Sequence, residues 1–175
     1  KYLKKKRINY FRGSELNVFS RYQGAAKKFN IENIIRITSD CPFVDFALLN
    51  KMKNIFKKKK LDYIANTLPI EKSCFPNGSD IEIFKSSLFD KIKVKKKSDK
   101  EHVTNIFWKK KFIKKKTFMS NKNLSKYRYT LDYKEDLIVL KEIHKYFSKK
   151  KSLISVSRNF KFLDNNKKLQ NKNSH

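Results

Sequence analysis

The sequence predicts an α/β domain with a mostly parallel sheet and helices on both of its faces. Short β-branched or apolar runs alternate along the chain with longer segments in which apolar residues recur at helical spacing. The 175 residues include no internal repeat and no interdomain linker, and they suffice to bury a core. We therefore predict one domain over residues 1–150, followed by a C-terminal tail over residues 151–175 that is partly helical or frayed.

Six segments have the pattern of strands. They are Ile8–Phe11, Ile34–Thr38, Leu61–Asn66, Asp80–Phe84, Phe118–Met119 and Tyr127–Asp132. Five further segments have helical spacing, namely Leu16–Phe29, a segment capped by Asp45 that runs to Lys58, Ser86–Val94, a helix beginning near Ser98 within a capping-box pattern, and Leu137–Phe147. The pattern weakens from Ser148, and we expect a frayed end over Gln170–His175.

The segment Asn33–Asp45, which reads NIIRITSDCPFVD, places a carboxylate in a position where ligands often bind. An apolar strand is followed by a break at Pro42 and then by a helix, so Asp40 lies at the carboxyl end of that strand. In open α/β sheets, ligands bind at this edge. The alternative is that Asp40 only forms a turn by bonding to its own backbone.

A second carboxylate, Asp132, follows the strand predicted at Tyr127–Asp132. Together with Glu135 it also matches the pattern of a capped helix start, so a purely structural role stays open. If both strands deliver an aspartate to the same edge, Asp40 and Asp132 form a pair of oxygen ligands suited to Mg²⁺. Cys41 has no visible base partner, and we interpret it as a small packed residue.

The charge balance raises the question of an anionic partner. The chain has 44 Lys and Arg against 16 Asp and Glu, a formal net charge of +28. The lysine runs are scattered along the whole chain, and several fall near predicted helix ends, where cations are favourable. We therefore rank nucleic-acid binding as an alternative function, to be recognised by a single basic face. No apolar run is long enough to span a membrane. The two cysteines are too few for a disulfide framework, so we expect a protein of the reducing cytoplasm.

Six stretches in order resemble a known family. They read FRGSELNVFSRYQGAAKKF, IIRITSDCPFVD, DYIANTLP, PNGSDIEIF, EHVT and RYTLDYKEDL, and they cover most of the chain from Phe11 to His144. The chain resembles the cytidylyltransferases that activate acidic sugars, which include acylneuraminate cytidylyltransferase and CMP-KDO synthetase. It is most similar to their relatives in spore-coat polysaccharide biosynthesis. The resemblance implies the three-layer, Rossmann-like sheet of the nucleotide-diphospho-sugar transferases.

The resemblance also implies a reaction and a site. A sugar hydroxyl would attack the α-phosphorus of CTP with Mg²⁺ present, and Asp40 and Asp132 would be the metal-binding, catalytic residues. Substrate-binding positions would be Arg12, Asn66, Asp80, Glu82 and Arg128. Arginine suits phosphate and carboxylate groups, but Arg36 and Arg128 have the alternative of pairing with a neighbouring acid in the sheet.

The chain also departs from the family pattern. Ser39 stands where relatives have Gly, Asn77 stands where they have Asp, and Tyr133-Lys134 replaces Thr-Pro. The family's first strand and its Gly-bearing triphosphate loop have no counterpart, so we expect a fragment that is inactive alone. An inactive relative acting as a partner subunit is a further alternative. The identity of the sugar, the choice of CTP over another nucleotide, and a homodimer all stay open.

Overall fold

A computed structural model describes residues 2–69, 72–152 and 154–173. Their strands are β1 (Asn33–Arg36), β2 (Tyr63–Ala65), β3 (Glu82–Lys85) and β4 (Lys115–Thr117), and they form one sheet in the order β1-β3-β2-β4. The helices are α1 (Tyr2–Lys5), α2 (Val18–Lys28), α3 (Phe46–Lys58), α4 (Leu88–Lys91), α5 (Lys97–His102), α6 (Asn105–Lys109), α7 (Lys134–Lys149), α8 (Val156–Asp164) and α9 (Lys167–Gln170), followed by the 3₁₀ turn η2 (Asn171–Asn173).

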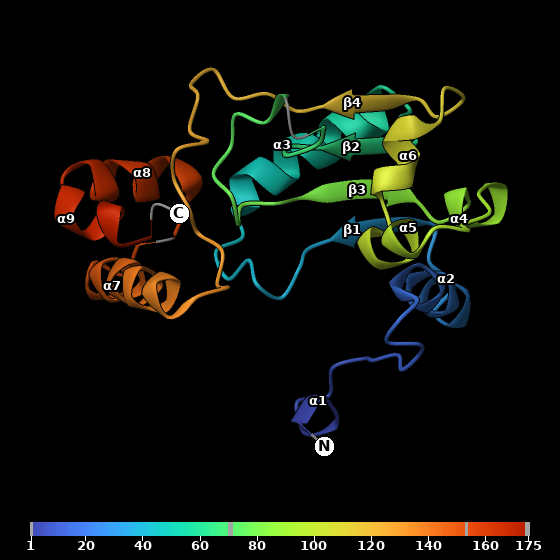
Figure 1. Cartoon of the computed structure of the whole chain (residues 1–175), viewed down its shortest axis with the longest axis horizontal. Coiled ribbons are helices and arrows are strands. Elements are labelled where there is room, and N and C mark those ends of the chain that lie inside the picture. The colour runs from blue at the N-terminus through green and yellow to red at the C-terminus, as the bar shows by residue number, and fades with distance from the viewer. Residues whose placement is uncertain (1, 70–71, 153, 174–175) are drawn as a thin grey trace.

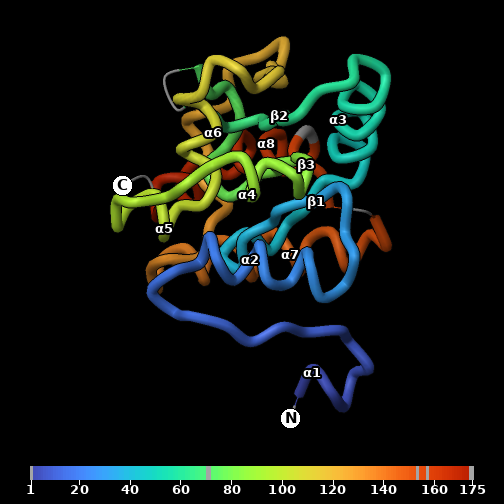
Figure 2. Tube along the Cα trace, turned by 90° about the vertical axis from the view of Figure 1, so that its right-hand side faces the viewer, coloured from blue at the N-terminus to red at the C-terminus, as the bar shows by residue number. Residues whose placement is uncertain are grey.

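The sheet lies between α3 on one side and α4 to α6 on the other, with α2 beside β1 and with α7 to α9 grouped beyond one end of the strands (Figures 1 and 2). This arrangement confirms the α/β class with helices on both faces. Strands β1, β2 and β4 point in one direction, because β1 and β2 are both antiparallel to β3 and β4 is parallel to β2. β3 runs against them. If β3 were parallel to β2, the chain between them would need a long crossover, usually a helix. In the described residues no α-helix lies between β2 and β3, which agrees with their antiparallel pairing.

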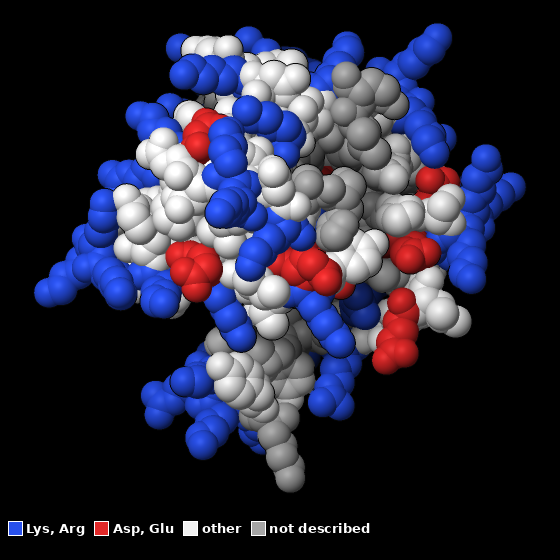
Figure 3. All heavy atoms as spheres, turned by 60° about the vertical axis from the view of Figure 1, so that its left-hand side comes forward, with Lys and Arg blue, Asp and Glu red and all other residues white. Residues whose placement is uncertain are grey.

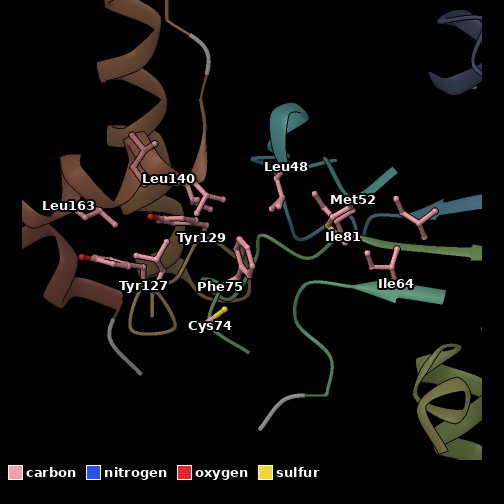
Figure 4. Packing of buried hydrophobic residues seen from close by; sticks show 14 of the residues in the cluster. Leu48, Met52, Ile64, Cys74, Phe75, Ile81, Tyr127, Tyr129, Leu140 and Leu163 are labelled. Atoms are coloured by element: carbon pink, nitrogen blue, oxygen red, sulfur yellow. The ribbon is translucent and has the colours of Figure 1, made fainter. Parts of the chain in front are cut away.

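Two apolar clusters hold the layers together, one on each face of the sheet. On the α3 face, Met52 packs with Ile64 and Ile83, and this cluster continues through Phe75 and Tyr129 into α7 and α8 (Figure 4). On the opposite face, a second cluster joins the sheet to α2, α4 and α6; it includes Phe19, Tyr63, Phe84, Phe89 and Phe107. Several of these rings pack edge to face, as Phe19 and Phe89 do with centroids 4.8 Å apart.

Side-chain caps fix the starts of α2 and α3. The side chain of Asp45 accepts hydrogen bonds from the N–H groups of Ala47 and Leu48, which confirms it as the N-cap of α3. Asn17 caps α2 in the same way. Ser98 does not cap α5, which begins at Lys97 without a side-chain cap, so that prediction is wrong.

Four other sequence predictions are wrong in their position or type. The segments Ile8–Phe11 and Tyr127–Asp132 are not strands of the sheet, and the strand predicted at Phe118–Met119 lies earlier, as β4. The backbone of 127–131 instead bonds to loops, with one isolated bridge between Asn77 and Arg128. Asn173 is buried within η2, so the expected frayed end is wrong for residues 170–173.

Candidate functional site

Asp40 and Asp132 come together through a contact between two loops. Asp40 lies in the turn that follows β1, and its carbonyl oxygen accepts a hydrogen bond from the N–H of Leu131 at 2.9 Å. Asp132 is the next residue after Leu131. The two aspartates therefore lie in adjacent loops, although Asp132 does not follow a sheet strand as the sequence predicted.

The Cys41 thiol lies between the carboxylates of Asp40 and Asp80. Its Sγ is 3.7 Å from Oδ1 of Asp40 and 3.5 Å from Oδ2 of Asp80, and it is 3.1 Å from the Thr38 hydroxyl. Burial, and the two nearby carboxylates in addition, raise the pKa of the Cys41 thiol to about 12. Cys41 is thus protonated at neutral pH, which agrees with a packing and hydrogen-bonding role.

Arg128 fixes the position of Asp132 from the other side. Its Nη2 donates to Oδ2 of Asp132 at 2.7 Å, while its Nε and Nη2 donate to the two oxygens of Asp136 at 2.8 and 3.0 Å. Because the guanidinium binds Asp136 through both of its oxygens, its plane is held firmly. Arg128 is therefore paired with neighbouring acids, the alternative that the sequence left open.

Asp136 is the buried centre of this group. Its side chain is inaccessible to solvent, and it accepts hydrogen bonds from the N–H groups of Asp132 and Tyr133 and from the amide of Asn173. Burial alone would raise the pKa of Asp136, but the bonds from Arg128 and from these donors outweigh burial and lower it. Asp136, at the third position of α7, satisfies the free backbone N–H groups at the helix start, so the capping role predicted for Asp132 belongs to Asp136.

A tight turn at Gly78 supports the same loop. Gly78 has φ +89°, and a Cβ atom there would lie 2.1 Å from the backbone nitrogen of Thr130. The N–H of Tyr129 donates to the carbonyl of Asn77 at 2.6 Å, and the N–H of Asn77 donates to the carbonyl of Tyr127 at 3.2 Å. The absence of a side chain at Gly78 is what lets the two backbones approach so closely.

Glu82 and Asn66, both predicted to bind substrate, are buried, and each of their side-chain polar atoms has a hydrogen-bond partner within the protein. The two carboxylate oxygens of Glu82 bind Arg36 and the Tyr63 hydroxyl, which links β1, β2 and β3. The Asn66 amide donates to the carbonyl of Ser79 and accepts from the N–H of Ile81, both at 2.8 Å. These contacts position the loop that carries Asp80. Arg12 is exposed in the segment before α2.

Sequence reasoning missed Asp136 and Asn173 as parts of the site. A signal for Asp136 was present, because Arg128, Asp132 and Asp136 are spaced four residues apart, and Tyr133 with Asp136 has capping-box spacing. Asn173 has no such signal, since its contact with Asp136 crosses 37 positions of the chain.

The donor set of this site suits Mg²⁺. Asp40 and Asp132 offer carboxylate oxygens in adjacent loops, and Mg²⁺ binds through one or two carboxylates while it keeps waters and substrate phosphates as other ligands. Within the described ranges, no cluster of three or more His, Cys, Asp or Glu side chains forms a complete metal cage. Asp40 and Asp132 are the residues of this group that would hold the ion.

The surface and the helices bear on the alternative functions. On the face shown in Figure 3, Lys and Arg side chains project at many separate places and acidic residues lie among them, so the positive charge of this face is not gathered in one groove. In residues 2–69, 72–152 and 154–173, no helix combines the length and apolar character needed to cross a membrane.

Comparisons with known proteins place the chain in a family. No family model matches it. It is 29% identical to an uncharacterised protein of Methanocaldococcus jannaschii over 174 residues, which are 95% of this chain and 68% of that protein. It is also similar to a solved cytidylyltransferase structure from Leptospira borgpetersenii, with 30% identity and a TM-score of 0.89, over 99% of this chain and 72% of that one. The chain belongs to the cytidylyltransferase family.

Proposed function

We propose that the protein transfers a cytidylyl group from CTP to a hydroxyl of an acidic sugar, in the synthesis of a surface polysaccharide. The family membership supports the transfer reaction. The observation that carries the site assignment is the Leu131–Asp40 hydrogen bond, because it brings the loop of Asp132 to the loop of Asp40. The acidic sugar rests on the resemblance in the six sequence stretches.

In this reaction the sugar oxygen forms a bond to the α-phosphorus of CTP, the bond from that phosphorus to the bridging oxygen breaks, and pyrophosphate leaves. The hydroxyl proton passes to water. Mg²⁺, when bound by Asp40 and Asp132, would supply positive charge beside the phosphates. The contribution of the chain itself is positional.

Two sets of contacts would hold the carboxylates in place. Arg128 keeps Asp132 fixed because it is itself locked onto buried Asp136. The Cys41 thiol and the Leu131 N–H restrain Asp40, the first at its carboxylate and the second at its carbonyl. Substitution of these supporting residues should lower the rate less than substitution of either aspartate, because in this proposal they position the carboxylates and do not bind the metal themselves.

The test is pyrophosphate release by the full-length protein that contains this sequence, with CTP, UTP or ATP and a panel of acidic and neutral sugars. We expect release only with CTP and an acidic sugar, and a complete loss when EDTA removes divalent cations. Absence of sugar-dependent release with every nucleotide would contradict the proposal and favour an inactive partner subunit. By resemblance, the triphosphate loop of the family has no counterpart in residues 1–175, so we propose that these residues alone give no turnover.

A further inference from the structure

A large cavity lies apart from the two aspartates, between the start of α3, the segment that follows β4, and the start of α8. It is open to solvent on one side and has a volume of about 710 Å³, which is within the range of roughly 300–1,000 Å³ for small-molecule sites. Ten of its lining residues are apolar: Phe46, Ala47, Leu48, Phe75, Phe118, Met119, Leu124, Ile154, Val156 and Phe160. Neither Asp40 nor Asp132 lines it.

The apolar floor of this cavity is continuous with the protein core. Leu48 and Phe75 belong to the cluster on the α3 face of the sheet and lie between the strands and the C-terminal helices (Figure 4). At the mouth the apolar surface is left open to solvent, since Phe46 is 67% exposed and Met119 is 52% exposed. Large apolar side chains so exposed beside a cavity are typical of a binding surface.

The polar part of the lining is cationic. Lys51, Lys122 and Arg158 line the cavity, and Lys122 lies over the Phe160 ring with its Nζ 5.9 Å from the centroid. Asp45 is the one acidic residue in the lining, and its two oxygens are already bonded to N–H groups of the protein. Its charge therefore offers no free acceptor to a ligand, whereas the lysine ammonium groups remain as donors for one.

We propose that this cavity binds a small amphiphilic anion, with its apolar chain or ring against the phenylalanines and its anionic head between Lys51 and Lys122. An apolar pocket with a few charged groups in its lining selects the orientation of such a ligand by charge and gains affinity by apolar burial. The inference does not rest on nucleotide transfer, because it uses none of the residues of the aspartate site.

The experiment is calorimetric titration of the purified full-length protein with decanoate, and in parallel with 1-decanol and decyltrimethylammonium as neutral and cationic probes. We expect decanoate to bind with one-to-one stoichiometry, decanol at least tenfold more weakly, and the cation more weakly still. Equal affinities for the anion and the cation would overturn the proposal, as would binding of many decanoate molecules per chain.

Matched variants locate the binding. Lys51→Glu should raise the dissociation constant for decanoate about tenfold, whereas Lys53→Glu, two positions along α3 and outside the lining, should leave it unchanged. Ala47→Trp should fill the cavity mouth and abolish binding without loss of the cooperative thermal transition. Equal effects of the two lysine variants, or undiminished binding by a folded Ala47→Trp protein, would refute the site. Asp132→Asn should leave the affinity for decanoate unchanged. A failure of the decanoate proposal can therefore be told apart from a failure of the proposed transfer activity.

Discussion

Gly78 gives the sharpest test of how the loop that carries Asp132 is positioned. In Gly78→Ala, the added Cβ would lie 2.1 Å from the nitrogen of Thr130 and 2.4 Å from the carbonyl carbon of Tyr129. Ordinary contacts of a Cβ atom begin near 3.4 Å, so the two backbones would have to separate by about 1.3 Å. The separation breaks the pair of backbone hydrogen bonds that Asn77 makes with Tyr127 and Tyr129.

The expected loss of stability has two contributions, the backbone conformation at position 78 and the two broken hydrogen bonds. A non-glycine residue in the left-handed region costs about 1–2 kcal/mol, and each broken hydrogen bond costs about 1 kcal/mol. The free energy of unfolding should therefore fall by about 3–4 kcal/mol. With a urea m-value of about 2 kcal/mol/M, the midpoint of unfolding shifts down by about 1.5–2 M.

Gly13→Ala is the matched control for this measurement. Its Cβ would meet only side-chain atoms, the nearest being Cε1 of Phe11 at 3.1 Å, and Gly13 does not have a positive φ. Urea unfolding of both variants, followed by circular dichroism, should show a change of no more than about 0.5 kcal/mol for Gly13→Ala. Equal midpoints for the two variants would refute the assignment of a close backbone approach at Gly78.

Two further predictions concern buried carboxylates. Asp45→Ala should lower the free energy of unfolding, measured in urea, by about 2–3 kcal/mol. The variant loses the cap of α3, and the buried N–H of Val156, 3.0 Å from Oδ2 of Asp45, loses its acceptor. A loss below about 0.5 kcal/mol would contradict this role. The pKa of Asp136 is lower in the folded protein than its ordinary value of 3.8. Ionised Asp136 therefore stabilises the fold at pH values above about 4, and this stabilisation is lost as the pH falls further. Asp136→Asn should therefore flatten the dependence of urea stability on pH between about pH 5 and pH 2, and identical slopes for variant and wild type would show that Asp136 is not the group responsible.

The parts of the fold that depend on local patterns could be predicted from the sequence. The strand before Asp40, the helix capped by Asp45, and the helix centred on Leu140 were all recognised, because apolar spacing and capping residues act over a few positions. Gly24 packs closely against the Phe11 ring, since a Cβ at this position would lie 2.7 Å from it.

Features that depend on distant contacts could not be predicted. Residues 127–131 have the composition of a strand, but their backbone bonds go to Asn77 and Asp40, and β4 takes the place beside β2. The sequence predicted Asp40 and Asp132 as a pair for the wrong geometric reason: they meet through loops, not through neighbouring strands. The role of Asn173 depends on the folding of the C-terminal segment against α7, which no local pattern encodes.

The central claim is that Asp40 and Asp132 act on one metal–triphosphate site, and a double-mutant cycle tests it most directly. The measurement is kcat/KM for Mg²⁺-dependent pyrophosphate release from CTP by the full-length protein, for Asp40→Asn, Asp132→Asn, the double variant, and exposed Asp90→Asn as control. If the two carboxylates share one site, kcat/KM should fall at least 100-fold in each single variant, which corresponds to about 2.7 kcal/mol. In the double variant kcat/KM should fall little further. Wild-type activity in either single variant, or losses that simply add in the double variant, would contradict the account.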